Sequence, residues 1–315
     1  MAWGGNAWHA LVNRGSQRVM LRRAFLGSAL ATAGLAIAAP AKSAEWRVVP
    51  DRVASADPGR ALPYNVFLPS GYDPDRGPYP LLVLLHGAGT DEQFWAGQIR
   101  LWRAVEAGQR AGLLPRLIAV MPGSRNSWWL DRPGTPAESA VVRDLLADVA
   151  AKYPVMTERA GRAIAGYSAG AYGALRIVLK HPELFGAAAL WAPAIYADLP
   201  PPLSAARRSP VFAGADGSFS PEAWKADAWP ALIPGYLAQP LRVPLFLAAG
   251  DHDRLETAFE AALLAKTIAP HQPDEIELRV VDGGHTMRVW EETIDEALVF
   301  MFAHLARQSL ALRHE

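Results

Sequence analysis

Short apolar runs alternate with longer amphipathic segments along the chain from about residue 46 onward. Apolar runs are typical of strands buried on both faces, and they predict strands at 64–68, 81–85, 117–121, 163–165, 186–191, 245–249 and 276–281. Apolar stripes at helical spacing predict helices at 91–107, 138–152 and 168–180, and a closing helix with Trp290, Ile294, Leu298, Met301 and Leu305 on its core face. This alternation predicts an α/β fold, with a mostly parallel central sheet and helices on both faces.

One segment, residues 197–241, interrupts the alternation. It is rich in proline, and the chain carries six aromatic residues in and beside it: Tyr196, Phe212, Phe219, Trp224, Trp229 and Tyr236. Long excursions of this kind are either packed surface structure or lids that offer aromatic surface to a substrate. The sequence leaves both interpretations open, and we refer to the segment as the insertion.

The first 44 residues are typical of an export signal. Arg22 and Arg23 precede an uncharged stretch that runs to about Ala39, and two small-x-small cleavage sites follow, ending at Ala41 and Ala44. The paired arginines resemble a twin-arginine signal, although Leu21 and Gly27 depart from its fuller pattern. A membrane anchor is the alternative, but the apolar run is short for a span. We expect cleavage, a translation start that could be Met20, and a mature domain at 45–315 that is periplasmic or secreted, with no stable membrane span.

Composition narrows the classes of function. Lys plus Arg and Asp plus Glu each number 31, so no basic excess points to nucleic acid. The chain has no cysteine, which excludes disulfides, a thiol nucleophile and cysteine-ligated metal.

Gly166-Tyr167-Ser168-Ala169-Gly170 has the G-x-S-x-G pattern, between a predicted strand and a predicted helix. At such a turn the serine hydroxyl is pushed outward by a strained backbone, and glycines are needed where a Cβ would clash. A glycine- and serine-rich turn without chemistry is the alternative. In this context Ser168 is a candidate nucleophile.

A serine nucleophile needs a base, and the base needs an orienting acid. His285 lies in a glycine-containing loop between the last predicted strand and the closing helix, and its imidazole suits general-base work. Asp253, three residues after Gly250, is the preferred acid; Asp251 is the second choice and could instead cap a helix, and Asp282 is the third. Residues 251–253 could also suggest a metal, but adjacent residues rarely all face one ion, and we expect none.

Acyl transfer also needs donors for a developing oxyanion. The backbone N–H of Ala169, directly after the serine, is one candidate. The N–H of Ala88 is the other, because the segment His86-Gly87-Ala88-Gly89 follows a central strand. We expect His86 to order this loop rather than to act as a base.

These pieces resemble the esterase D or "putative esterase" family of α/β-hydrolases, which includes feruloyl, acetylxylan and enterochelin-type esterases and mycolyltransferases. The matching segments lie at 84–95, 120–129, 162–174, 180–185, 250–253 and 283–290. The resemblance implies an α/β-hydrolase fold with Ser168 as nucleophile, Asp253 as acid and His285 as base. Tyr167, Ala169 and the pair Thr286-Met287 depart from common family residues beside the acyl pocket, so the resemblance does not identify the substrate.

We therefore predict a serine carboxylesterase that acts on a small-molecule or carbohydrate-linked ester without a cofactor. An acyltransferase that uses the same acyl-enzyme, and a binding protein on a hydrolase fold, are the alternatives. Trp95, Trp128 and Trp290 are candidate walls of the substrate site, although aromatic residues in such positions are as often core. The natural ester and the oligomeric state stay open.

Overall fold

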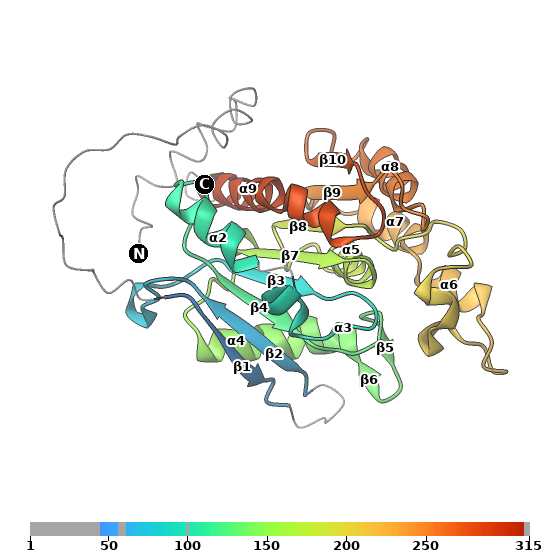
Figure 1. Cartoon of the computed structure of the whole chain (residues 1–315), viewed down its shortest axis with the longest axis horizontal. Coiled ribbons are helices and arrows are strands. Elements are labelled where there is room, and N and C mark those ends of the chain that lie inside the picture. Colours follow the sequence, from blue (N-terminus) through green and yellow to red (C-terminus); the bar gives the residue numbers. More distant parts are fainter. Residues whose placement is uncertain (1–44, 56–60, 99–100, 312–315) are drawn as a thin grey trace.

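The computed structural model describes residues 45–55, 61–98 and 101–311 (Figure 1). Its centre is an eight-stranded sheet in the order β1-β2-β4-β3-β7-β8-β9-β10. The strands are β1 (Arg47–Arg52), β2 (Pro63–Leu68), β3 (Leu81–Leu85), β4 (Ile118–Pro122), β7 (Arg162–Tyr167), β8 (Ala187–Trp191), β9 (Leu245–Gly250) and β10 (Ile276–Val281). Neighbours in this order from β4 to β10 pair in parallel, and β2 pairs antiparallel with both β1 and β4. This confirms the predicted α/β fold.

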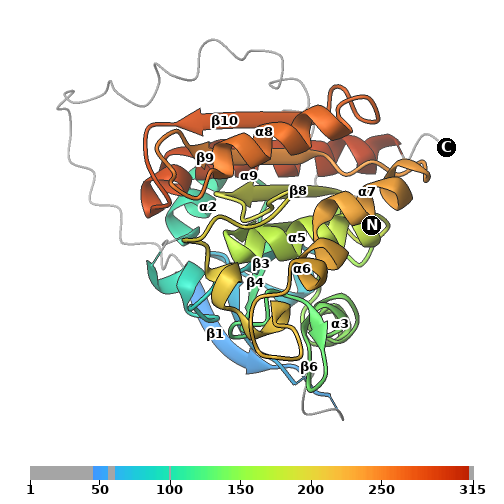
Figure 2. The same ribbon diagram turned by 90° about the vertical axis from the view of Figure 1, so that its right-hand side faces the viewer.

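Helices cover both faces of the sheet. The helices are α2 (Leu101–Arg110), α3 (Ala137–Ser139), α4 (Leu146–Lys152), α5 (Ala169–Lys180), α6 (Pro221–Asp227), α7 (Trp229–Leu237), α8 (Thr257–Ile268) and α9 (Met287–Ala311). Figure 2 shows α5, α6, α7 and α8 in front of the sheet and α9 behind it. Single turns of π-helix lie at Phe94–Gln98 and Ala140–Leu145, and the two-residue strands β5 (Asp131–Arg132) and β6 (Thr135–Pro136) form a hairpin.

The side chains of β3 divide between two apolar cores because successive residues of a strand point to opposite faces. Leu81, Val83 and Leu85 join the core under α4, α5 and α8. Leu82 and Leu84 join the core under α2 and α9. All five are fully buried, as expected for a central strand covered on both sides.

The expected helix at 91–107 is present as a π-helical turn and an α-helix. Its first part is the π-helical turn Phe94–Gln98, and its second part is α2, which begins at Leu101 and continues to Arg110. The expected helix at 138–152 is present as α3, the second π-helical turn and α4 in succession.

The insertion consists of α6, α7 and short 3-10 turns at Ala205–Arg208 and Pro210–Phe212. Asp227 attaches it to α5, because the main-chain oxygen of Asp227 accepts hydrogen bonds from the Tyr172 hydroxyl at 2.9 Å and from the Arg176 guanidinium. Most of its aromatic residues are buried, and Phe219, which lies under the Arg207 guanidinium, is the partly exposed one. The insertion is therefore packed structure whose aromatic residues join the core on one face of the sheet, and its buried rings offer little surface to a substrate in this conformation.

The sequence predicted an export signal and no stable membrane span. The proposed signal at 1–44 lies outside the described residues. Within the parts that are described, no helix combines the length and the apolar character that a membrane crossing requires.

Candidate active site

Ser168 lies at a sharp turn between β7 and α5. Its φ is positive, with φ 55° and ψ −115°, which is a strained conformation for a residue with a side chain. The turn is fixed on both sides: the Ser168 N–H donates to the Trp191 carbonyl at 2.9 Å, and the Ser168 carbonyl accepts from the Tyr172 N–H at 3.1 Å. A reversal of this kind aims the hydroxyl away from the sheet at the carboxyl ends of the strands.

Two glycines make the turn possible. A Cβ added to Gly166 would lie 2.2 Å from the main chain of Gly170, and one added to Gly170 would lie 2.1 Å from the carbonyl oxygen of Leu85. Because no real Cβ approaches so closely, α5 can begin against the end of β3 only with glycine at both positions.

A chain of hydrogen bonds joins the three predicted catalytic residues. The imidazole of His285 lies with Nε2 2.9 Å from Ser168 Oγ and with Nδ1 2.8 Å from Asp253 Oδ2. The Asp253 side chain is 1% exposed, whereas 20% of the His285 side chain is open to solvent. The structure therefore brings together three residues that are far apart in the sequence, with the acid buried and the imidazole at the surface.

The carboxylate of Asp253 is held as an anion. Burial raises the pKa of this carboxyl, but hydrogen bonds from His285, Thr257 and the Leu255 N–H outweigh burial and leave the pKa below its usual value. An ionised carboxylate can only accept, so Nδ1 of His285 carries the proton and Nε2 is free to accept from the Ser168 hydroxyl.

Asp251 and Asp282, the other two acid candidates, lie away from the imidazole. The Asp251 side chain is 46% exposed, and it accepts a hydrogen bond from the Gly283 N–H at 3.0 Å. That contact lowers the pKa of Asp251, with burial acting weakly in the opposite sense. Asp282 is exposed and pairs with Arg288 at 2.8 Å. Asp251 thus fastens the loop that carries His285.

Ligand atoms of Asp251, His252 and Asp282 lie within 4.8 Å of one another, the one such group with metal-binding spacing among the described residues. All three side chains are exposed, and each has a partner within the protein. Asp253, which the sequence placed beside them, points instead to His285.

The segment that carries Ala88 lies beside the serine turn. A Cβ added to Gly87 would lie 2.9 Å from the Tyr167 ring, and Gly170 packs against Leu85 and His86. The N–H of Ala169 opens α5, where the first amides of a helix have no acceptor within it. Both candidate oxyanion donors therefore lie at the same edge of the sheet as Ser168.

His86 orders this segment, as predicted. It is buried, its Nδ1 lies 2.8 Å from the Gly87 carbonyl, and its Nε2 accepts from the Ser124 N–H at 3.1 Å. These contacts define a neutral ring with the proton on Nδ1, and burial lowers the pKa of His86 accordingly. Asn126, from the loop after β4, accepts from the Gly89 N–H at 2.7 Å and joins the two loops.

The three candidate tryptophans lie in the cores. Trp95, Trp128 and Trp290 are each 3% exposed or less, so their rings have no free surface for a substrate in this conformation. Trp95 packs against Phe94 and Trp191, and Trp128 packs against Tyr172 and the insertion. Trp290 lies behind Tyr167, with ring centroids 4.1 Å apart.

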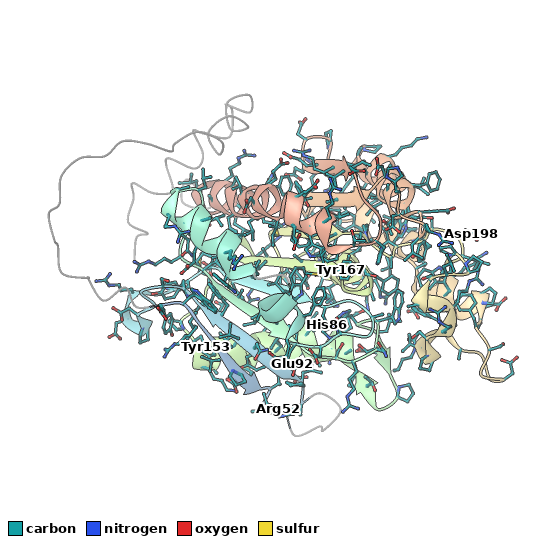
Figure 3. All side chains as sticks on the ribbon, viewed as in Figure 1. Arg52, His86, Glu92, Tyr153, Tyr167 and Asp198 are labelled. Atoms are coloured by element: carbon teal, nitrogen blue, oxygen red, sulfur yellow. The ribbon has the colours of Figure 1, made fainter. Side chains whose placement is uncertain are left out.

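Tyr167 is an aromatic residue that the sequence argument used only as a departure from the family pattern. Tyr167, which Figure 3 labels, is the last residue of β7. Its ring lies 5.3 Å from the His285 ring and stacks on Phe94 at 5.4 Å, and its side chain is partly exposed. The signal was its place directly before the serine. Thr257, which donates to Asp253, was also missed, and its signal was its place four residues after the acid.

A mostly parallel sheet with a serine turn, a buried aspartate and a loop histidine defines the α/β-hydrolase class of enzymes. The family model described as "Putative esterase" matches residues 55–301, and the chain belongs to that family. Esterase Rv1288 of Mycobacterium tuberculosis is 32% identical over 130 residues, which are 39% of this chain and 27% of the relative. A bifunctional endo-1,4-beta-xylanase/feruloyl esterase of Xylanibacter ruminicola is 28% identical over 141 residues, 42% of this chain and 19% of that protein. The chain spans about a quarter of the length of these curated relatives.

Solved structures share the fold at lower sequence identity. A ferulic acid esterase aligns with a TM-score of 0.70 at 22% identity, covering 83% of this chain and 99% of that one. FphF, a fluorophosphonate-binding serine hydrolase of Staphylococcus aureus, aligns with a TM-score of 0.63 at 20% identity, covering 82% and 99%. These matches show that the chain shares the fold of these solved hydrolases.

Proposed function

We propose that this protein is a serine carboxylesterase in which Ser168 is the nucleophile, His285 the general base and Asp253 the acid that orients the imidazole. The observation that carries the proposal is the unbroken hydrogen-bonded chain from Asp253 through His285 to Ser168 at a strained turn. Family membership gives the reaction class, and the geometry supports these residues for its chemistry.

The proposed reaction proceeds in two halves. His285 Nε2 takes the proton of the Ser168 hydroxyl while Oγ attacks the ester carbonyl, and the buried Asp253 stabilises the imidazolium that forms. The amides of Ala88 and Ala169 donate to the tetrahedral oxyanion. The imidazolium then gives its proton to the leaving alcohol, and water, activated by the same imidazole, releases the acid from the acyl-enzyme.

The decisive test is a Ser168→Ala variant assayed with short p-nitrophenyl esters. We expect kcat/KM to fall by at least about 10⁴-fold because the variant lacks the hydroxyl that His285 Nε2 contacts. Ser218→Ala, an exposed serine of the insertion, is the matched control and should retain full activity. Equal activity in Ser168→Ala and the unaltered protein would remove Ser168 from the mechanism.

A fluorophosphonate probe gives an independent measurement. It should label Ser168 of the folded protein and fail to label the alanine variant. Absence of labelling would instead favour a non-catalytic binding protein. Product analysis with an acceptor sugar then separates hydrolysis from acyl transfer, since faster transfer than hydrolysis would identify an acyltransferase.

We propose small-molecule or carbohydrate-linked esters as substrates. The support is the likeness to a ferulic acid esterase and to a bifunctional xylanase/feruloyl esterase. Competition of aryl and sugar esters with the serine probe ranks the candidates. If none of them competes while a simple alkyl ester does, the carbohydrate-linked class is excluded.

Residues 1–44 carry a separate proposal, namely export to the periplasm or beyond. Its support is the order of paired arginines, uncharged stretch and small-residue sites. Amino-terminal sequencing of the protein from an exporting host should begin at residue 42 or 45. Full-length protein in the cytoplasmic fraction would contradict it.

A further inference from the structure

Thr257, the first residue of α8, contacts the acid directly. Its hydroxyl donates to Asp253 Oδ2 at 2.5 Å, and the same oxygen accepts the Nδ1–H of His285 at 2.8 Å. The other oxygen, Oδ1, accepts from the Leu255 N–H at 2.8 Å. The plane of the carboxylate is thus fixed by three donors, and two of them come from the segment that follows the acid.

A strained residue brings Thr257 to this position. Glu256 has left-handed backbone angles, φ 60° and ψ 23°, and its N–H donates to the Asp253 carbonyl at 2.9 Å. The chain therefore turns back on itself and begins α8 with Thr257 against the carboxylate. Strain of this kind at a non-glycine residue is kept where the surrounding structure requires it.

Water cannot take the place of the threonine hydroxyl. Thr257 is fully buried, and the Asp253 side chain is 1% exposed. A buried carboxylate that loses a donor loses the full free energy of that hydrogen bond, because no solvent molecule reaches it.

We propose that Thr257 is a positioning residue that orients Asp253, and through it the imidazole of His285, by sharing the oxygen that the imidazole uses. The inference rests on the proposed function of Ser168, His285 and Asp253. Thr257 touches neither the substrate nor the serine in this scheme, and it acts only through the carboxylate.

The physical consequence has two parts. With the hydroxyl present, part of the negative charge on Oδ2 is taken up by Thr257, so the carboxylate stabilises the imidazolium less strongly. Without it, the imidazole binds its proton more tightly, and the carboxylate is held by fewer donors. In a variant without the hydroxyl, the tighter binding of the proton moves the acid limb of the kcat/KM profile to higher pH. The loss of a donor to the carboxylate lowers the plateau.

Other charged or titratable groups lie around the pair and stay unchanged in the test. The Tyr167 ring is tilted against the His285 ring. The other groups come from the two loops, the start of α9, α8 and the loop before the insertion: Asp251, His252, Arg254, Glu256, Asp282, Arg288, Glu260 and Tyr196. A change in the profile on removal of one hydroxyl therefore reports the contact with Asp253.

Three variants separate the hydroxyl from packing. Thr257→Val keeps the branched shape and removes the donor, and Thr257→Ser keeps the donor and removes the methyl group. Thr267→Val is the matched control in the same helix, because the Thr267 hydroxyl donates to the Leu263 carbonyl at 2.8 Å, within α8.

We expect Thr257→Val to lower the plateau of kcat/KM roughly 10-fold and to raise the midpoint of the acid limb by about half a pH unit or more. Thr257→Ser and Thr267→Val should keep the profile of the unaltered protein. If Thr257→Val is folded and its profile is unchanged, or if Thr257→Ser shifts as far as Thr257→Val, the proposal is overturned.

Two further measurements keep the outcome clear. Should Thr257→Val fail to fold, Thr257→Ala compared with Thr257→Ser answers the same question, and the low-field proton resonance of His285 Nδ1–H should move in the alanine variant alone. Ser168→Ala distinguishes failure of the proposed function from failure of the inference about Thr257. An active Ser168→Ala variant contradicts the proposed function. An inactive Ser168→Ala variant together with an unshifted Thr257→Val profile contradicts only the role of Thr257.

Discussion

Asp251 and Asp253 are two residues apart and have different surroundings. Asp253 is buried, and its carboxylate accepts hydrogen bonds from His285, Thr257 and the Leu255 N–H. Asp251 is half exposed and holds the Gly283 N–H, so solvent screens its charge. At the scale of single residues, burial and direction rather than residue type decide which carboxylate can support the imidazole.

Substitution of each aspartate by asparagine should separate these surroundings. Asp253→Asn places an amide against Nδ1, favours the wrong imidazole tautomer and should lower kcat/KM by about 10³- to 10⁴-fold. Asp251→Asn keeps an oxygen for the Gly283 N–H and should lower kcat/KM by less than about 10-fold. Steady-state kinetics on one aryl ester measures both. Equal losses in the two variants would contradict the assignment of Asp253.

Some residues of the site could be predicted from the sequence and others could not. Ser168, Asp253 and His285 were predicted because each follows a strand, and parallel strands end at one edge of the sheet. Thr257 could not be predicted, since its contact depends on the left-handed turn at Glu256. Trp128 and Trp290 were proposed as walls because an indole suits a core and a binding site equally well in a sequence.

At the scale of elements, the apolar runs predicted the central strands because those strands are covered on both faces. Strand β1 was missed. It is an edge strand with the sequence Arg-Val-Val-Pro-Asp-Arg, which is charged at both ends and carries no apolar run.

The contact between α5 and β3 is the element-level feature that places the serine. Gly170→Ala would put a methyl group 2.1 Å from the Leu85 carbonyl, so α5 must move away from the sheet. We expect a loss of about 3 kcal/mol or more in the free energy of unfolding, together with loss of esterase activity. Denaturant unfolding monitored by fluorescence measures the loss in the free energy of unfolding.

A second glycine provides the control for this prediction. Gly235 lies inside α7, and a Cβ there meets nothing within 4 Å. Gly235→Ala should be neutral or stabilise by up to about 1 kcal/mol, because alanine loses less backbone entropy in a helix. A Gly170→Ala variant as stable as Gly235→Ala would show that the close approach of α5 and β3 is not required.

At the scale of the whole molecule, a partly buried ionic cluster joins the hydrolase core to the insertion. Glu138 of α3 contacts Arg176 and Lys180 of α5, and Arg176 in turn reaches Asp227 of the insertion. Arg132 also pairs with Asp227, at 2.5 Å. Sequence could not predict this cluster, because its members come from four separate segments that only the fold brings together.

The cluster predicts how stability depends on pH. Burial alone raises the pKa of Glu138, but contacts with His181 and Lys180 and the charge of Arg176 outweigh it and lower the pKa to about 2. A carboxyl whose pKa is lower in the folded state stabilises the fold above its unfolded pKa, here 4.5, and this contribution is lost as the pH falls toward 2. Acid should therefore weaken the attachment of the insertion.

Glu138→Gln tests this linkage, because glutamine resembles the protonated carboxyl. Near pH 7 the free energy of unfolding of the variant should be about 3 kcal/mol lower than that of the unaltered protein, because Arg176 loses its buried charged partner. The difference should narrow steadily below pH 4.5, as the natural carboxyl also becomes neutral. Glu222→Gln, at an exposed carboxylate of α6, should show no such gap. Denaturant midpoints measured from pH 7 to pH 3 decide the matter: a gap that stays constant across this range would mean that Glu138 acts through shape and not through its charge.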